Sequence, residues 1–170
     1  MVQFKGEEAP LEGTFLKPGD IAMNFMLVND KLENVTLEHF RGKTKVIITV
    51  VSLDTGVCAT EAMRVEDVSR EFPDVAFLIV TRDLPFAASR FCLQNKLGNV
   101  TVLSDIRPSC LFGRHYGVQI HKHKLEGLFA RSVIVLNVSD KVIYSELVPE
   151  ITEEPNYEAL KSILLSHRMA

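Results

Sequence analysis

The stretch VIITVVSLDTGVC, residues 46–58, is the clearest indication of the fold in this 170-residue chain. Its first six residues are all β-branched and form a continuous rather than an alternating pattern. Such a run is typical of a strand that is buried on both faces, as in a sheet covered by helices. A turn with polar residues and a glycine follows, and a helical pattern begins at Cys58. The stretch therefore predicts a strand, a turn and a helix within an α/β fold.

Comparable segments recur along the chain and extend this unit into a larger sheet. Further strands are predicted at residues 75–80, 100–103, 132–136 and 142–148. Helices are predicted at residues 58–72, 85–93 and 155–165, with a short helix after the third strand. Pro85 and Pro155 each open one of these helices, because proline suits a first helical turn. This order predicts a single α/β domain over residues 1–170, with a central sheet of mixed direction and helices on both faces.

Two hairpins are predicted at the margins of this sheet. Residues 137–140 join the last two strands closely enough for an antiparallel hairpin. Residues 1–18 are expected to form a small N-terminal hairpin extension, in which Gln3-Phe4 pairs with Phe15-Leu16. A further short strand is expected before residue 45.

Composition and charge exclude several classes of protein. The chain is 46% hydrophobic and 24% charged with a net charge of −3, which is ordinary for a globular domain and argues against a dedicated binder of nucleic acids or anionic membranes. No apolar run approaches the ~18 residues of a membrane span, and the N-terminus lacks a signal-peptide pattern. We therefore expect a cytoplasmic protein, in which three cysteines do not form a permanent disulfide framework.

Cys58 occupies the position of greatest chemical interest, at the start of the helix that follows the first core strand. Unpaired backbone N–H groups and the helix dipole favour a thiolate there, so we expect the pKa of Cys58 to fall below the free value of ~8.5. The hydroxyl of Thr55, three residues earlier, can donate a hydrogen bond to the sulfur or to a bound oxygen. The alternative is that Cys58 is a small buried apolar residue, which is the commoner fate of a free cysteine.

Cys92 lies near the end of the second predicted helix and is a candidate resolving thiol. Attack by this thiol on an oxidised Cys58 would close a disulfide. The bond requires Cα atoms about 4.4–6.8 Å apart, and the two cysteines lie on different predicted helices. We therefore expect a rearrangement around Cys92, by local unfolding, to precede bond formation.

A set of short motifs along the chain carries a family resemblance. The motifs are DTGVC at 54–58, DLPFA at 83–87, SRFC at 89–92, LSDIR at 103–107, YGV at 116–118, LFARSV at 128–133 and EEPNYEA at 153–159. Together they resemble the bacterial thiol peroxidases, a branch of the peroxiredoxins. The resemblance extends from about Gly19 to Leu164 and includes the cysteine spacing of that family.

The resemblance implies a thioredoxin-like fold and the reduction of hydrogen peroxide and organic hydroperoxides. It implies that Cys58 is the peroxidatic cysteine, that Thr55 supplies the hydroxyl of the peroxidatic motif, and that Arg131 is the cation beside the thiolate. Cys92 would be the resolving cysteine, forming a Cys58–Cys92 disulfide that thioredoxin reduces. The family also implies a homodimer, and no metal, haem or flavin cofactor.

One departure from the family motif bears on activity. The family has proline seven residues before the peroxidatic cysteine, and this chain has Val51 there. Valine lacks the rigid ring and adds a backbone N–H, so we expect weakened rather than abolished turnover. Val51 also supports the alternative of a non-enzymatic redox sensor or binding protein. A thiol–disulfide oxidoreductase is less well supported, because the chain lacks a Cys-x-x-Cys arrangement.

The remaining candidates are interpreted as structural residues. Cys110 has no counterpart role in the family and is read as a packed thiol. His121 and His123 lie two residues apart in a charged loop, which supplies too few ligands for a metal site. Three aspartates each follow a core strand and are read as loop or helix-cap groups rather than acid–base catalysts; they are Asp54, Asp83 and Asp105.

Overall fold

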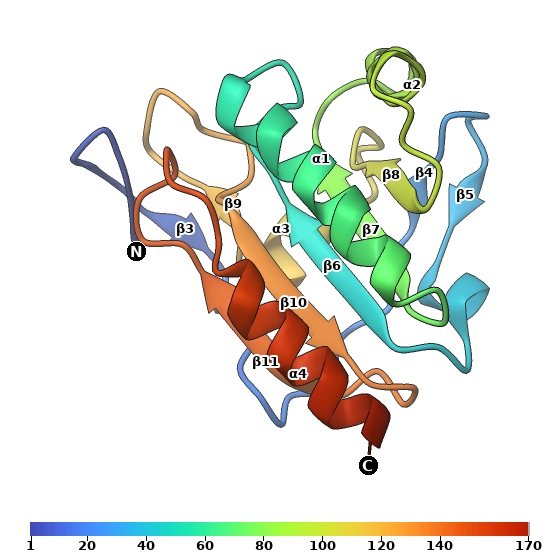
Figure 1. The fold of residues 1–170 in the computed structure, drawn as a ribbon. Coiled ribbons are helices and arrows are strands. Elements are labelled where there is room, and N and C mark those ends of the chain that lie inside the picture. Colours follow the sequence, from blue (N-terminus) through green and yellow to red (C-terminus); the bar gives the residue numbers. More distant parts are fainter. Residues whose placement is uncertain (170) are drawn as a thin grey trace.

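A seven-stranded mixed sheet forms the centre of the computed structural model, which describes residues 1–169 (Figure 1). The strand order is β11-β10-β6-β7-β8-β4-β5. The strands are β4 (Leu27–Val28), β5 (Asn34–Val35), β6 (Lys45–Thr49), β7 (Ala76–Thr81), β8 (Val100–Ser104), β10 (Ser132–Leu136) and β11 (Val142–Leu147). Strands β6, β7 and β8 are parallel, and the other pairings are antiparallel. The predicted mixed sheet, its five core strands and the β10–β11 hairpin are therefore confirmed.

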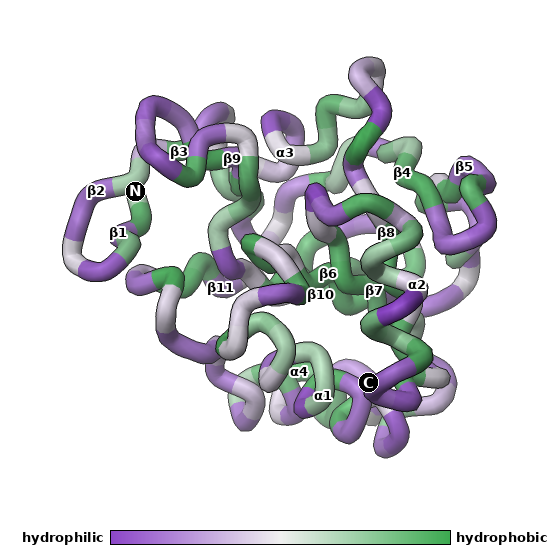
Figure 2. The backbone as a smooth tube through the Cα atoms, turned by 90° about the horizontal axis from the view of Figure 1, so that it is seen from above, coloured by the Kyte–Doolittle hydropathy of each residue, from purple (hydrophilic) through white to green (hydrophobic). Residues whose placement is uncertain are grey.

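Helices cover both faces of the sheet, as predicted. They are α1 (Gly56–Glu71), α2 (Pro85–Gln94), α3 (Phe112–His115), α4 (Tyr157–Met169) and the 3-10 helix η1 (Leu37–Phe40). Val46 and Ile48 of β6 join the core shared with α1, α2 and α4, whereas Ile47 joins a second core with α3 and η1. Figure 2 shows the apolar chain concentrated in the central strands β6, β7 and β10. Both faces of the central strands are thus buried, which explains the continuous β-branched run.

The N-terminal segment forms a hairpin, but not with the predicted partner strand. β1 (Val2–Phe4) pairs with β2 (Glu7–Ala9), and Phe15 and Leu16 lie outside any strand. Lys5 and Gly6 have φ angles of 51° and 82°, which is the backbone of a tight two-residue hairpin turn. The chain then continues as β3 (Leu11–Glu12), which pairs with the distant β9 (Gln119–Ile120). The short turn therefore closes the hairpin before Phe15 is reached.

Two helices begin at other residues than predicted. Helix α1 begins at Gly56, two residues before the predicted start, and Cys58 lies in its first turn as predicted. Helix α4 begins at Tyr157 rather than at Pro155. The reason is the Asn156 side chain, whose Oδ1 accepts the Ala159 N–H (3.0 Å) and satisfies a backbone donor of the first turn. Within the described residues, no helix combines the length and apolar character that a membrane crossing requires.

Candidate active site

Cys58 is buried at the N-terminal end of α1, where that helix leaves the carboxyl end of β6. It is the third residue of the helix, Thr55 is the N-cap residue, and the Cys58 side chain is 0% exposed. Backbone N–H groups in a first turn have no acceptor within the helix, and the helix dipole makes this end positive. The structure therefore places the sulfur where a negative charge is stabilised.

Asp83 fixes the turn that leads into α1. Its carboxylate accepts hydrogen bonds from Ser52 Oγ (2.7 Å), the Leu53 N–H (2.8 Å) and Thr81 Oγ1 (3.0 Å). Asp83 also lies two residues before α2, so one carboxylate connects the Cys58 loop to the start of the helix that carries Cys92. This is the structural loop role that the sequence predicts for Asp83.

Thr55 and Val51 occupy the two ends of this turn. The Thr55 hydroxyl donates to the carbonyl oxygen of Ser52 (2.9 Å), so its proton is directed into the turn in this structure. Val51, which stands where the family has proline, is only 6% exposed and packs in the same apolar cluster as Cys58. An apolar side chain thus shields the cysteine loop at this position.

Arg131 lies beside Cys58, although the two residues are far apart in the sequence. It directly precedes β10, is 1% exposed, and donates through Nε (2.9 Å) and Nη2 (2.8 Å) to the carbonyl oxygen of Ile151. Its Nη1 donates to Oε2 of Glu61. Burial acts to lower the pKa of Arg131, but the negative charge of Glu61 and the Cys58 sulfur outweigh burial and raise it. A fixed guanidinium therefore faces the cysteine.

Glu61 is a residue of this site that the sequence analysis missed. It lies one turn after Cys58 on α1 and is 0% exposed. Burial raises its pKa to about 7, even though the charge of Arg131 acts in the opposite direction. A sequence signal was available, because Glu61 is adjacent to Ala62 on a helix whose buried face also includes Val65. An acidic residue at the margin of an apolar stripe is a candidate for a buried charge.

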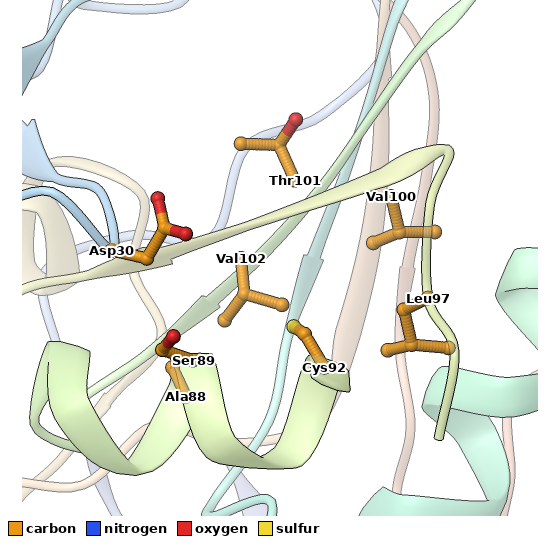
Figure 3. A pocket seen from close by; sticks show the side chains of 8 residues that line it. All are labelled: Asp30, Ala88, Ser89, Cys92, Leu97, Val100, Thr101 and Val102. Carbon is orange, nitrogen blue, oxygen red and sulfur yellow. The ribbon is translucent and has the colours of Figure 1, made fainter. Parts of the chain in front are cut away.

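Cys92 lies on α2 and points into a separate cavity of about 190 Å³ between α2 and β8 (Figure 3). Burial raises the pKa of this thiol to about 11, and the carboxylates of Asp30 and Glu66 add to the effect.

Pro85 and Ala88 are the buried residues of α2, while Phe86 and Leu93 are 66% and 78% exposed. The helix that carries Cys92 is thus weakly anchored, because few of its side chains are buried. Both Cys58 and Cys92 are free thiols in this structure.

The remaining candidates lie outside this site. Cys110 is half-buried, and burial raises the pKa of its thiol to about 11. Asp105 lies 3.7 Å from Arg82 in an ion pair. His121 faces Glu12 at 3.0 Å. No cluster of three or more histidine, cysteine, aspartate or glutamate residues suited to a metal ion occurs within residues 1–169.

Comparisons with known proteins agree with this arrangement. The Redoxin family matches residues 17–161. The thiol peroxidase of Listeria monocytogenes is 40% identical over 158 residues, covering 93% of this chain and 93% of that protein. The thiol peroxidase of Helicobacter pylori is 40% identical over 163 residues, covering 96% and 98%. A peroxiredoxin-like protein from Aquifex aeolicus superposes with a TM-score of 0.91 at 39% identity, covering 97% and 95%.

The matches span almost the whole chain, and the solved structure superposes on 97% of it. They confirm both the family resemblance read from the motifs and the thioredoxin-like fold that it implies. The chain belongs to the redoxin family, as a peroxidase of its thiol peroxidase branch.

Proposed function

We propose that this protein reduces hydrogen peroxide and organic hydroperoxides, with Cys58 as the peroxidatic cysteine. The observation that carries this proposal is the position of Cys58, which is buried at the N-terminus of α1 and faces the guanidinium of Arg131. Both features stabilise a thiolate, which is the reactive form of cysteine. The thiolate attacks the terminal oxygen of the peroxide, the O–O bond breaks, and Cys58 becomes a sulfenic acid. The departing hydroxide or alkoxide takes up a proton.

Arg131 stabilises the charge that moves during this step. Negative charge passes from the sulfur to the departing oxygen, and preorganised donors along that path lower the barrier. The guanidinium stays charged at any relevant pH. Its hydrogen bonds to the carbonyl oxygen of Ile151 hold it in place. The Thr55 hydroxyl joins these donors once it turns from the Ser52 carbonyl toward the peroxide.

We assign the resolving role to Cys92. Its thiol attacks the sulfenic sulfur of Cys58, so a disulfide forms and water leaves. The two cysteines are on separate helices, so α2 must first unwind locally. The cavity beneath α2 and the small number of its buried residues favour such unwinding. Unwinding also exposes the Cys92 thiol to water, which removes the burial that raises its pKa and allows a reactive thiolate to form.

Thioredoxin is the reductant that we propose for the disulfide, and the family supports a homodimer as the functional form. A thioredoxin-coupled cycle operates where thiols are kept reduced, so the proposal also places the protein in the cytoplasm. Residues 1–170 would act as one domain, in which the N-terminal hairpin is an extension of the core.

The test is peroxide-dependent oxidation of thioredoxin by the wild type and three single variants. Cys58→Ser should be inactive. Cys92→Ser should consume one equivalent of peroxide and then stop, because its sulfenic acid has no partner thiol. Cys110→Ser is the matched control and should turn over like the wild type. Normal turnover by Cys58→Ser would refute the proposal, and full turnover by Cys92→Ser would refute the assignment of the resolving cysteine.

A further inference from the structure

The Glu61 carboxyl group is a buried acid that the mechanism above leaves without a role. Glu61 and Cys58 are three residues apart on α1, so their side chains are neighbours on one helix surface. Oε2 of Glu61 accepts a hydrogen bond from Arg131. Oε1 is buried and has no hydrogen-bond partner among residues 1–169. Such an oxygen is costly as part of a carboxylate and much less costly as part of a protonated acid.

Several titratable or charged groups face Glu61 from the elements packed around it. They are Arg131 before β10, Glu146 on β11, Glu154 in the loop before α4, Tyr157 on α4, and Cys58 on the same helix. The two glutamates are bound elsewhere, since Glu154 accepts the Tyr157 hydroxyl (2.8 Å) and Glu146 accepts the Asn156 N–H (3.0 Å). Arg131 therefore supplies the positive charge that is hydrogen-bonded to Glu61.

This arrangement sets one buried cation between two acids. Arg131 is 1% exposed, and Glu61 and Cys58 are each 0% exposed. The guanidinium can balance one negative charge in this enclosed space, whereas a second negative charge would repel the first at low effective dielectric. Two acids that interact in this way do not titrate independently, because their protons are released in coupled steps.

We propose that Glu61 is a positioning residue that shares the Arg131 charge with Cys58, so that the Glu61 carboxyl holds a proton whenever Cys58 is a thiolate. This inference rests on the proposed role of Cys58. The raised pKa of Glu61, which burial causes and which the repulsion by Glu154 and Glu146 increases, agrees with a protonated carboxyl near neutral pH. The sulfur can then become a thiolate without adding a second buried charge.

The protons and charges of the reaction with peroxide also balance when Cys58, Glu61 and Arg131 are considered together. The Cys58 thiolate, the Glu61 acid and hydrogen peroxide give a neutral sulfenic acid, a Glu61 carboxylate and water. The sulfur loses two electrons, the O–O bond takes them up, and the hydroxide leaves to solvent, where the proton that Glu61 releases after the thiolate is consumed neutralises it. Arg131 keeps one anionic partner throughout, first the thiolate and then the carboxylate. The net charge of the buried site is therefore unchanged by the reaction.

Glu61→Gln tests the proposal, because glutamine keeps the size of the side chain and an oxygen that accepts the Arg131 N–H. The thiolate of Cys58 is titrated by its ultraviolet absorbance in a Cys92→Ser, Cys110→Ser background, and the rate of oxidation by hydrogen peroxide is measured across the same pH range. We expect the ionisation midpoint of Cys58 to fall by about one pH unit or more. Between the two midpoints, the variant should then react up to about tenfold faster, in proportion to its thiolate fraction, and the two rates should converge at lower pH, where Glu61 is protonated in the wild type.

The control is Glu66→Gln, which changes another buried glutamate of α1 that binds the N–H groups of Asn99 and Val100 instead of Arg131. The titration curve of Cys58 in this variant should coincide with that of the Cys92→Ser, Cys110→Ser protein. If the Glu61→Gln curve coincides as well, or if the rate falls equally at every pH, Glu61 only orients Arg131 and the proposal is wrong.

A reciprocal measurement does not depend on the reaction with peroxide. The carboxyl absorption of Glu61 is followed by infrared difference spectroscopy, in which the Glu61→Gln variant identifies the band. Linkage requires that Cys58→Ser shift the Glu61 midpoint downward by the same amount that Glu61→Gln shifts that of Cys58. An unshifted band would overturn the inference. If the Glu61 and Cys58 midpoints shift each other but Cys58 does not react with peroxide, the proposed peroxidase function is wrong and the charge sharing through Arg131 still holds.

Discussion

Replacing Glu61 with glutamine should change how the stability of the protein depends on pH. The folded state raises the pKa of Glu61 from 4.5 to about 7, chiefly through burial. The folded protein then binds this proton more tightly than the unfolded chain does, so the stability that Glu61 contributes is fully present below pH 4.5 and is lost as the pH rises toward 7. The folded and unfolded pKa values of Glu61 differ by about 2.5, and each pKa unit corresponds to about 1.4 kcal/mol. The free energy of unfolding that is lost between pH 4.5 and pH 7 is therefore about 3 kcal/mol.

The assay is urea unfolding of the wild type and Glu61→Gln at a series of pH values from 4 to 8. The difference in unfolding free energy between the two proteins should move by about 3 kcal/mol over this range, in favour of the variant at higher pH. Parallel stability curves would contradict this prediction, because they would mean that Glu61 has the same proton affinity in the folded and the unfolded chain.

Glu150 provides a control of opposite sign. Hydrogen bonds from the backbone N–H groups of Thr152 and Gly6 lower its pKa from 4.5 to about 2. The stability that Glu150 contributes is therefore present above pH 4.5 and is lost as the pH falls toward 2. Glu150→Gln should differ from the wild type by a constant amount above pH 5, and the difference should shrink only in acid.

Three further substitutions test other parts of the site. Arg131→Lys should lower the second-order rate with peroxide about 10²–10³-fold, because a single ammonium cannot serve both the Ile151 carbonyl and the sulfur; a stopped-flow rate within threefold of wild type would contradict this. Asp83→Asn should cost about 2 kcal/mol in urea unfolding, since its charged hydrogen bonds hold the turn before α1, and an unchanged midpoint would refute that role. Arg90→Gly, at an exposed position of α2, should destabilise that helix by about 0.8 kcal/mol and therefore speed formation of the Cys58–Cys92 disulfide about fourfold. The control Ser162→Gly, at an exposed position of α4, should leave the rate of disulfide formation unchanged. Equal rates in the wild type and both variants would show that unwinding of α2 does not limit this step.

Local patterns in the sequence were sufficient for most of the sheet and for the position of Cys58. The strand at β6 could be predicted because both of its faces are buried, which requires apolar residues at successive positions rather than at alternate ones. The helix start near Cys58 could be predicted because it follows such a strand through a short turn. These features depend on residues that are adjacent in the chain.

The N-terminal segment shows where local patterns fail. Phe15 and Leu16 are apolar neighbours that suggest a strand, but they pack against the second core instead. The nearby strand β3 is formed by pairing with β9, more than a hundred residues away. No local signal marks such a pair, since a two-residue strand gains its stability from its distant partner.

An α/β sheet and a cysteine in the first turn of a helix could be predicted from the residues alone, and the motifs indicated the family of the chain. The resemblance already implied Arg131 beside Cys58, but the contact of Glu61 with Arg131 and the burial of both side chains follow only from the folded chain. The physical reason is that the charge state of a carboxyl or a thiol depends on desolvation and on the charges a few ångströms away. Those quantities are set when the segment before β10 packs against α1, and they are not encoded at any single position of the chain.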